Sequence, residues 1–242
     1  MKILVIPDLH GSNIWKPMIN EPHDLCVFLG DYCDSFTYSN EYIINNLLDI
    51  IQYKKDNFEK VVLLLGNHEL PYIYLNDRRF KCSGHRPEID FTLNYIFREN
   101  KDLFLNAFQV DNFIFTHAGI QHNWFIQEFK GNLNENIAKQ LNNPRNREQL
   151  NALYYVGLKR RGFGSLDRHN VGGIFWCDKD ELKKPLKGYI QVVGHTHINK
   201  LVMQKRKDSI ILFCDYLHYT YADEVDEPLI IDTNDKIYLL LC

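Results

Sequence analysis

The sequence has no apolar run long enough to cross a membrane and no excess of basic residues. A transmembrane helix needs about 18 or more apolar residues in succession, and no stretch of these 242 residues approaches that length. Met1 and Lys2 lead directly into the first apolar stretch, so we expect no secretory signal peptide. The net charge of −3 gives no global positive field for nucleic acid. We therefore expect a cytoplasmic protein with no membrane partner and no strong nucleic-acid signal.

The six cysteines include no Cys-x-x-Cys pair. They are scattered along the chain, at positions 26, 33, 82, 177, 214 and 242. Such spacing excludes the usual thiolate zinc motifs and does not indicate a disulfide framework. Cys26 and Cys214 lie inside apolar runs and are expected to be buried. A reducing compartment without disulfides is therefore the default expectation.

Low-complexity linkers and internal repeats are also missing, and 45% of the residues are hydrophobic. One large core can form from such a chain, and α/β domains of this length are commonly single. We expect residues 1–242 to form one domain. The region 120–171 is rich in Asn, Gln, Lys and Arg, and we expect it to be a mostly helical insertion.

Five apolar runs each lead into polar residues that can bind metal ions. The runs cover residues 3–6, 25–29, 61–65, 113–115 and 190–193. Their continuous apolar character is typical of parallel strands that are covered on both faces. In open α/β sheets, ligands bind beyond the carboxyl ends of the strands. The side chains at these positions are Asp8, His10, Asp31, Asp34, Asn67, His68, His117, His195 and His197.

Any one of these blocks alone would be read as a turn or a helix cap, because Gly, Asn and Asp are ordinary turn residues. The five blocks together are different, since each follows a strand-like run and offers oxygen or imidazole ligands. The pattern indicates a metal site with enough ligands for two ions.

Helical periodicity appears between the strand-like runs. Apolar stripes predict helices over residues 40–53 and 88–99, the crossover segments that a parallel sheet requires. After His197 the pattern changes to β, with strands expected over residues 200–204, 209–214, 228–232 and 236–241. Asn234 and Asp235 are expected to form a hairpin turn.

These motifs resemble those of the calcineurin-like metallophosphoesterases, in particular the branch of serine/threonine protein phosphatases and symmetrical diadenosine tetraphosphatases. The resemblance spans residues 1 to about 200 in family order. It implies an α/β fold, a four-layer α/β/β/α sandwich of two mixed sheets flanked by helices. The matching pieces are Asp8-x-His10-Gly11, Gly30-Asp31-Tyr32-x-Asp34, Gly66-Asn67-His68-Glu69, His117-Ala118-Gly119 and Gly194-His195-Thr196.

The resemblance implies a centre of two divalent ions that share Asp31. The first ion would be bound by Asp8, His10 and Asp31, with His197 as a candidate fourth ligand. Carboxylate, amide and imidazole donors suit Mn²⁺, our first expectation, or a mixed Fe/Zn pair. Such a pair clamps phosphate oxygens and lowers the pKa of a bridging water that attacks phosphorus. The second ion would be bound by Asp31, Asn67, His117 and His195.

His68 and Asp34 are the expected catalytic pair. The resemblance implies that His68 is not a ligand but the general acid that protonates the leaving oxygen, a task suited to imidazole. Asp34 would hydrogen-bond His68 and hold its tautomer. The alternative for Asp34 is a helix cap, and Glu69 is expected to be structural.

One departure from the resembled family concerns substrate binding. Where that branch has Arg-Gly after the second Asp, this chain has Ser35 and Phe36. The missing Arg holds the substrate phosphate in the family, so another Arg is expected to replace it. Arg160 and Arg161, followed by Gly162-Phe163-Gly164, are the first candidates. The other candidates are Arg78, Arg79, Arg86 and Arg168.

The expected function is hydrolysis of a phosphate monoester on a phosphorylated protein or a nucleotide. A phosphodiesterase or nuclease is the alternative, which the Gly-His-Thr-His ending at His197 permits and Ser35 favours. A non-catalytic scaffold of the same fold is a third hypothesis. Scaffolds of this type lose ligands or the general-acid His, whereas this chain retains them. The sequence leaves the oligomeric state open.

Overall fold

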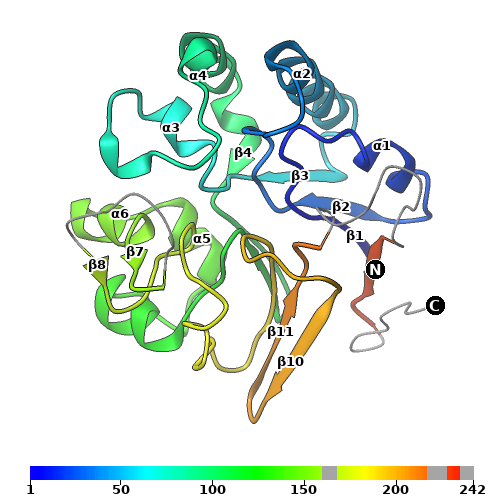
Figure 1. The fold of residues 1–242 in the computed structure, drawn as a ribbon. Coiled ribbons are helices and arrows are strands. Elements are labelled where there is room, and N and C mark those ends of the chain that lie inside the picture. Colours follow the sequence, from blue (N-terminus) through cyan, green and yellow to red (C-terminus); the bar gives the residue numbers. More distant parts are fainter. Residues whose placement is uncertain (160–167, 217–227, 235–242) are drawn as a thin grey trace.

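Two five-stranded sheets form the centre of the structure, a computed structural model that describes residues 1–159, 168–216 and 228–234 (Figure 1). In the first sheet four strands run parallel, and β12 pairs antiparallel with β1 at one edge. Its order is β12 (Leu229–Asp232), β1 (Lys2–Ile6), β2 (Leu25–Phe28), β3 (Val61–Leu64) and β4 (Phe104–Leu105).

The second sheet has three parallel strands in its middle and an antiparallel strand at each edge. Its β10 and β11 form a hairpin that projects at the bottom of Figure 1. The order is β10 (Val202–Arg206), β11 (Ser209–Phe213), β9 (Ile190–Val193), β6 (Phe113–Thr116) and β5 (Ala107–Val110). Both sheets are therefore mixed, as predicted.

The two sheets pack face to face through alternate residues of their strands. Val5 and Val27 of the first sheet share a buried cluster with Phe115 and Val192 of the second. Successive side chains of a strand point to opposite faces, so neighbours such as Phe28 belong to a different cluster, under the helices. The apolar runs are continuous because both faces of these strands are covered.

Two long helices cover the outer face of the first sheet (Figure 1). They are α2 (Asn40–Asp56), which Ser39 caps by accepting from the Tyr42 amide, and α4 (Asp90–Glu99). The prediction of helices near 40–53 and 88–99 is confirmed, although Pro87–Ile89 forms a 3₁₀ turn before α4. Shorter elements are α1 (Trp15–Met18), α3 (Leu70–Ile73) and 3₁₀ turns at Arg78–Phe80 and Lys101–Leu103.

The outer face of the second sheet is covered by the segment that follows β6. Its helices are the π-helix Trp124–Glu128, α5 (Ile137–Asn142) and α6 (Arg147–Leu153), and two short strands follow, β7 (Val156–Gly157) and β8 (Arg168–His169). Phe125, Leu141 and Leu153 share a buried cluster with Ile114 of β6. The predicted four-layer α/β/β/α sandwich is confirmed.

The strands predicted near residues 200–204, 209–214 and 228–232 are present as β10, β11 and β12. The strand predicted at 236–241 and Asp235 of the predicted turn lie outside the described residues. That residues 1–242 form one domain stays a prediction. None of the helices in the described ranges combines the length and the apolar character that a membrane span requires.

Candidate metal centre

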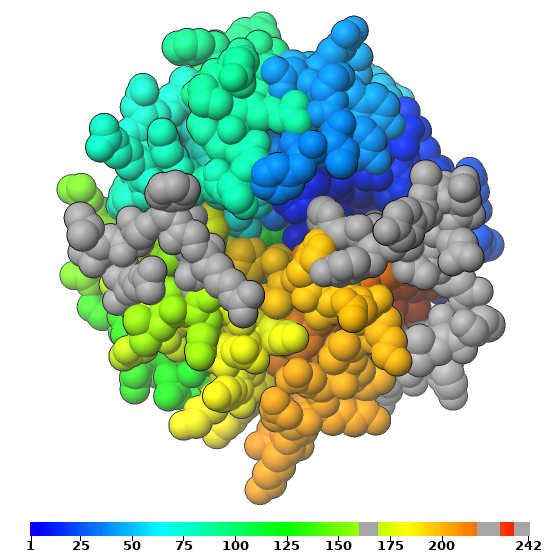
Figure 2. Space-filling model, in the orientation of Figure 1, coloured from blue at the N-terminus to red at the C-terminus, as the bar shows by residue number. Residues whose placement is uncertain are grey.

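The loops after β1, β2, β3, β6 and β9 bring most of the predicted ligands together. Asp31, after β2, lies at the middle of the group. Its Oδ2 atom is 3.4 Å from His117 Nε2, 3.7 Å from His10 Nε2 and 4.0 Å from His68 Nε2. Figure 2 shows a face of the molecule on which the first part of the chain (blue to cyan) meets the later part (yellow to orange).

Two sets of side chains in the described residues could each hold an ion, and they share Asp31. The first set is His10, Asp31 and His68, and the second is Asp31, His117 and His195. Within each set the ligand atoms lie within 4.8 Å of one another. One carboxylate placed between two sets of ligands is the arrangement that a two-metal site needs.

Asn67 completes the second set with its amide oxygen. Asn67 Oδ1 lies 2.8 Å from both His117 Nε2 and His195 Nδ1. The other nitrogen of His117, Nδ1, donates to the carbonyl of Leu29 at 2.9 Å, so Nε2 of the neutral ring carries a lone pair. Burial lowers the pKa of His117 well below its usual value, which keeps the ring neutral. The lone pair of His117 Nε2 and the amide oxygen of Asn67 are both acceptors, and they lie 2.8 Å apart. Two acceptors come this close when both bind the same cation.

The buried acids also fit a cation. Burial raises the pKa of Asp8 well above its usual value, and the charges of Asp215 and Asp31 raise it further. Burial likewise raises the pKa of Asp31 to about 8, although the charge of His68 acts in the opposite direction. Asp8 Oδ2 accepts from the His195 amide at 2.9 Å, whereas the buried Oδ1 has no hydrogen-bond partner among the described residues. Divalent ions would supply the missing positive charge and the missing partner.

The backbone is strained at four of these positions. His10, Asp31, Asp34 and His195 have φ values of 45°, 53°, 60° and 64°, in the left-handed region. Non-glycine residues rarely adopt this conformation, and such strain gathers at functional sites.

Glycines of the motifs allow the acids to approach the backbone closely. A Cβ on Gly66 would lie 2.1 Å from Asp31 Oδ1, and one on Gly194 would lie 2.0 Å from Asp8 Oδ1. Any side chain at either position would displace a carboxylate of the cluster. The two motif glycines are thus required by close packing.

Glu69 fastens the loop after β2 to the loop after β3. Its Oε2 accepts the amides of Gly66 and Asp31 at 2.8 Å, and Oε1 accepts those of Tyr32 and Cys33 at 2.9 and 3.2 Å. The side chain is fully buried. Glu69 therefore positions Asp31 through the backbone. Each of its two carboxylate oxygens accepts two backbone amides.

His68 is held by Asp34, and Asp34 is held by Tyr72. His68 Nδ1 lies 2.9 Å from Asp34 Oδ2, and the hydroxyl of Tyr72 donates to Asp34 Oδ1. Burial disfavours the charged form of His68, but Asp31 and Asp34 outweigh it and raise the pKa to about 9. Tyr72 lies in α3, directly after the third motif. It is buried and belongs to this hydrogen-bonded chain.

His197 lies apart from the two sets. Its Nδ1 is 3.1 Å from Asp215 Oδ2, and 44% of its side chain is exposed. Asp215 directly follows the apolar run that ends β11 and is buried. Sequence reasoning did not select Asp215, although an acid directly after a strand was the available signal.

The loop after Asp34 explains what Ser35 does. Ser35 is buried, and its Oγ accepts the amides of Thr37 and Tyr38 at 3.2 Å. Arg86 donates to the carbonyls of Ser35 and Tyr38 and, at 2.6 Å, to Asn40 Oδ1. Arg86 therefore holds this loop, and the exposed Arg79 pairs with Asp77. Arg160 and Arg161 lie outside the described residues.

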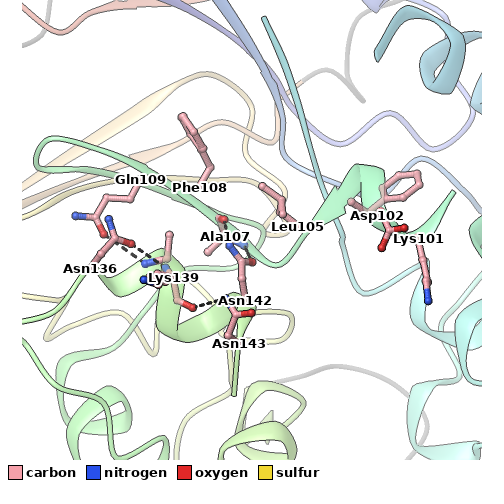
Figure 3. Close-up of a pocket in the computed structure, with 12 residues that line it drawn as sticks. Lys101, Asp102, Leu105, Ala107, Phe108, Gln109, Asn136, Lys139, Asn142 and Asn143 are labelled. Atoms are coloured by element: carbon pink, nitrogen blue, oxygen red, sulfur yellow. Dashed lines mark hydrogen bonds between the residues drawn. The ribbon is translucent and has the colours of Figure 1, made fainter. Parts of the chain in front are cut away.

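A surface groove of about 520 Å³ lies elsewhere, between the β4–β5 connection and α5 (Figure 3). None of the predicted site residues lines it. Its amide side chains serve the fold: Asn142 Oδ1 accepts the amides of Asn106 and Ala107, and Gln109 Oε1 accepts those of Ile137 and Ala138.

Comparison with known proteins identifies the family. The family model described as calcineurin-like phosphoesterase matches residues 1–235. The chain belongs to this family. It is a metal-dependent phosphoesterase, and the resemblance drawn from its motifs is confirmed. No curated protein matches the sequence.

Two solved structures share the fold at 17% sequence identity. One is a cold-active protein tyrosine phosphatase, with a TM-score of 0.61 over 96% of this chain and 74% of the other. The second is a serine/threonine phosphatase from Saccharomyces cerevisiae with similarity to human phosphatase PP5, with a TM-score of 0.50 over 88% of this chain and 67% of the other. At this identity the likeness is one of fold.

Proposed function

We propose that this phosphoesterase is a phosphomonoesterase that uses two divalent ions, with His68 as the general acid. One observation carries the proposal: His68 is held by Asp34 while its other nitrogen faces Asp31, which both sets of ligands share. Phosphoryl transfer depends on positioning and on compensation of charge, and this arrangement offers both.

The proposed ligands include five of the six positions in the two sets, leave His68 out as the acid, and add Asp8, Asn67 and His197. Asp8, His10 and Asp31 would bind one ion, with His197 as a further ligand. Asp31, Asn67, His117 and His195 would bind the other. When bound, such a pair polarises phosphate oxygens and lowers the pKa of a water molecule. We propose Mn²⁺, with an Fe/Zn pair as the alternative, because the donors are carboxylate, amide and imidazole.

His68 would give its Nε2 proton to the leaving oxygen. Asp34 accepts from Nδ1 and so favours the imidazolium that serves as the acid. Bound ions would offset the charge of Asp31, which leaves Asp34 as the group that sustains this protonation. Tyr72 prevents the Asp34 carboxylate from turning away.

The proposed substrate is a phosphorylated protein or a nucleotide, in the cytoplasm. Arg160 and Arg161 are proposed to bind its phosphate, since Ser35 turns into its own loop and Arg86 is engaged there. A bidentate Arg favours a monoester dianion over a diester. Replacing Arg160 or Arg161 by Ala should therefore raise KM for monoesters more than for diesters in at least one of the two variants.

The test compares p-nitrophenyl phosphate with bis-p-nitrophenyl phosphate, each with added Mn²⁺. The proposal predicts a kcat/KM for the monoester that clearly exceeds that for the diester. A higher kcat/KM for the diester would favour a phosphodiesterase. The absence of the family Arg at Ser35 supports that alternative. Activity on neither substrate, with metal bound, would point to the scaffold hypothesis.

A further inference from the structure

Tyr72 is a buried tyrosine whose hydroxyl group lies next to the candidate catalytic pair. It belongs to α3, and its side chain is fully buried. A buried tyrosine hydroxyl usually finds a partner, and that of Tyr32, for example, donates to the Leu64 carbonyl at 2.8 Å. Tyr72 differs because its hydroxyl donates to Asp34 Oδ1, and Asp34 holds the candidate acid His68.

Asp34 divides its two carboxylate oxygens between two partners. Oδ1 accepts from Tyr72, and Oδ2 lies 2.9 Å from His68 Nδ1. The torsion that turns a carboxylate about its last bond has only broad minima, so a single hydrogen bond leaves the plane free to swing. A second donor on the other oxygen fixes the plane. It thereby also fixes the direction of the His68 ring, whose Nε2 faces Asp31 Oδ2 at 4.0 Å.

The direction of the Tyr72 hydroxyl is set by the backbone of a later segment. The Arg86 amide donates to the hydroxyl oxygen at 3.1 Å. A phenol carries one hydrogen and can also accept, so the oxygen accepts from Arg86 and the hydrogen is directed to Asp34. Burial, together with the charge of Asp34, raises the pKa of Tyr72 far above its usual value, which keeps the hydroxyl protonated.

The rest of Tyr72 is fixed by α4 and by the segment that leads into it. Asn94 of α4 donates to the Tyr72 carbonyl at 2.7 Å. The His85 ring packs against the Tyr72 ring, with centroids 5.1 Å apart, and His85 Nε2 lies 2.7 Å from Asp90 Oδ1. A group that positions a catalytic side chain must itself be held in place by packing and hydrogen bonds. Tyr72 meets this requirement.

We propose that Tyr72 is a positioning residue for the general acid, because its hydroxyl holds the Asp34 carboxylate at the angle that directs His68 Nε2 toward the leaving oxygen. This inference rests on the proposed function and extends the catalytic pair to a chain of three side chains. The hydroxyl is bonded to Asp34 and to Arg86, neither of which is a proposed ligand. Its loss should therefore slow proton transfer and leave the ions bound.

The experiment measures kcat and KM for phenyl phosphate, which has a poor leaving group, and for p-nitrophenyl phosphate, which has a good one. Tyr72→Phe should lower kcat for phenyl phosphate about 10- to 100-fold, the usual contribution of a hydrogen bond to a charged group, with KM unchanged. The loss should be smaller for p-nitrophenyl phosphate, whose leaving oxygen needs no proton. The ratio of the two kcat values should therefore fall, and this ratio does not change if part of the variant is unfolded.

Tyr74→Phe is the matched control. It removes a hydroxyl group two residues along the chain, one that lies 2.7 Å from the Tyr154 hydroxyl, and it should leave the ratio unchanged. A double variant then shows whether Tyr72 acts through the acid. In a His68→Asn background, Tyr72→Phe should lower kcat no further, because the group that it positions is missing. Elemental analysis should find the ions retained in Tyr72→Phe.

An unchanged ratio of the two kcat values in Tyr72→Phe would overturn the assignment. Loss of metal from this variant, or a further fall in kcat in the double variant, would also overturn it, because Tyr72 would then act on the centre and not through His68. A His68→Asn variant that hydrolyses phenyl phosphate as fast as the wild type would instead refute the proposed role of His68 itself. The two failures are therefore distinguishable.

Discussion

The two ligand sets that share Asp31 differ in how far they are enclosed. In the second set only His195 is half-buried, and His117 is completely buried, with its ring fixed by the Leu29 carbonyl and facing Asn67. In the first set the side chains of His10 and His68 are 20% and 13% exposed. An enclosed set with fixed orientations suits an ion that is retained. An open set suits the entry of substrate and the transfer of a proton to it.

The largest effect should come from the residue that both sets share. Asp31→Asn removes a negative charge from both proposed ion sites, so at least one ion should be lost and turnover should fall by several orders of magnitude. Elemental analysis together with kcat would measure this. Two retained equivalents of metal with near-normal turnover would show that Asp31 is not the bridge.

The next largest effect should separate the acid from the ligands. His68→Asn should retain both ions and lower turnover about 10²- to 10⁴-fold, the usual contribution of general acid catalysis. The loss should shrink for substrates with good leaving groups, which need no proton. His117→Asn is the matched control from the enclosed set and should lose metal. Loss of metal in His68→Asn as well would make His68 a ligand.

A smaller effect is expected at His197, which lies outside both sets. His197 Nδ1 is held by Asp215, and Nε2 is the ring nitrogen that is proposed to bind the first ion. His197→Ala should weaken binding of one ion about 10- to 100-fold and leave the other unchanged. Calorimetric titration with Mn²⁺ distinguishes the two steps. Two unchanged steps would remove His197 from the ligand set.

The smallest effect should come from a residue behind the enclosed set. Asn67 Nδ2 donates to Cys82 Sγ at 3.5 Å, and this contact keeps Oδ1 directed at His117 and His195. Cys82→Ala should lower affinity for the second ion by about 10-fold or less, since such a neutral bond is weak. Cys82→Ser keeps an acceptor and should restore it. Equal affinity in both variants would mean that Cys82 does not position Asn67.

The sequence predicted the strands and the ligands at their ends because both are local. A continuous apolar run followed by Asp, Asn or His is visible in a short window, and parallel strands bring such ends together. The observed ends of the helices and of the edge strands differ from the predicted ends by a few residues. Caps and turns determine where these elements begin and end. His197 shows the limit of a motif, since the described geometry places it next to Asp215 and outside both sets.

The supporting residues could not be predicted, because their partners are distant in the sequence. Tyr72 contacts Asp34, and Arg86 contacts the carbonyls on either side of Phe36, across gaps that no motif spans. Arg86 was a candidate to replace the missing family Arg because it follows the third motif. Only the structure shows that its guanidinium donates hydrogen bonds to the loop after Asp34.

The central claim is that Asp31 lies between two ions, and anomalous diffraction from crystals grown with Mn²⁺ tests it most directly. The account predicts two anomalous peaks about 3.5–4 Å apart, with the Asp31 carboxylate contacting both, His10 at one and Asn67 at the other. A single peak, or two peaks of which only one contacts Asp31, would contradict it.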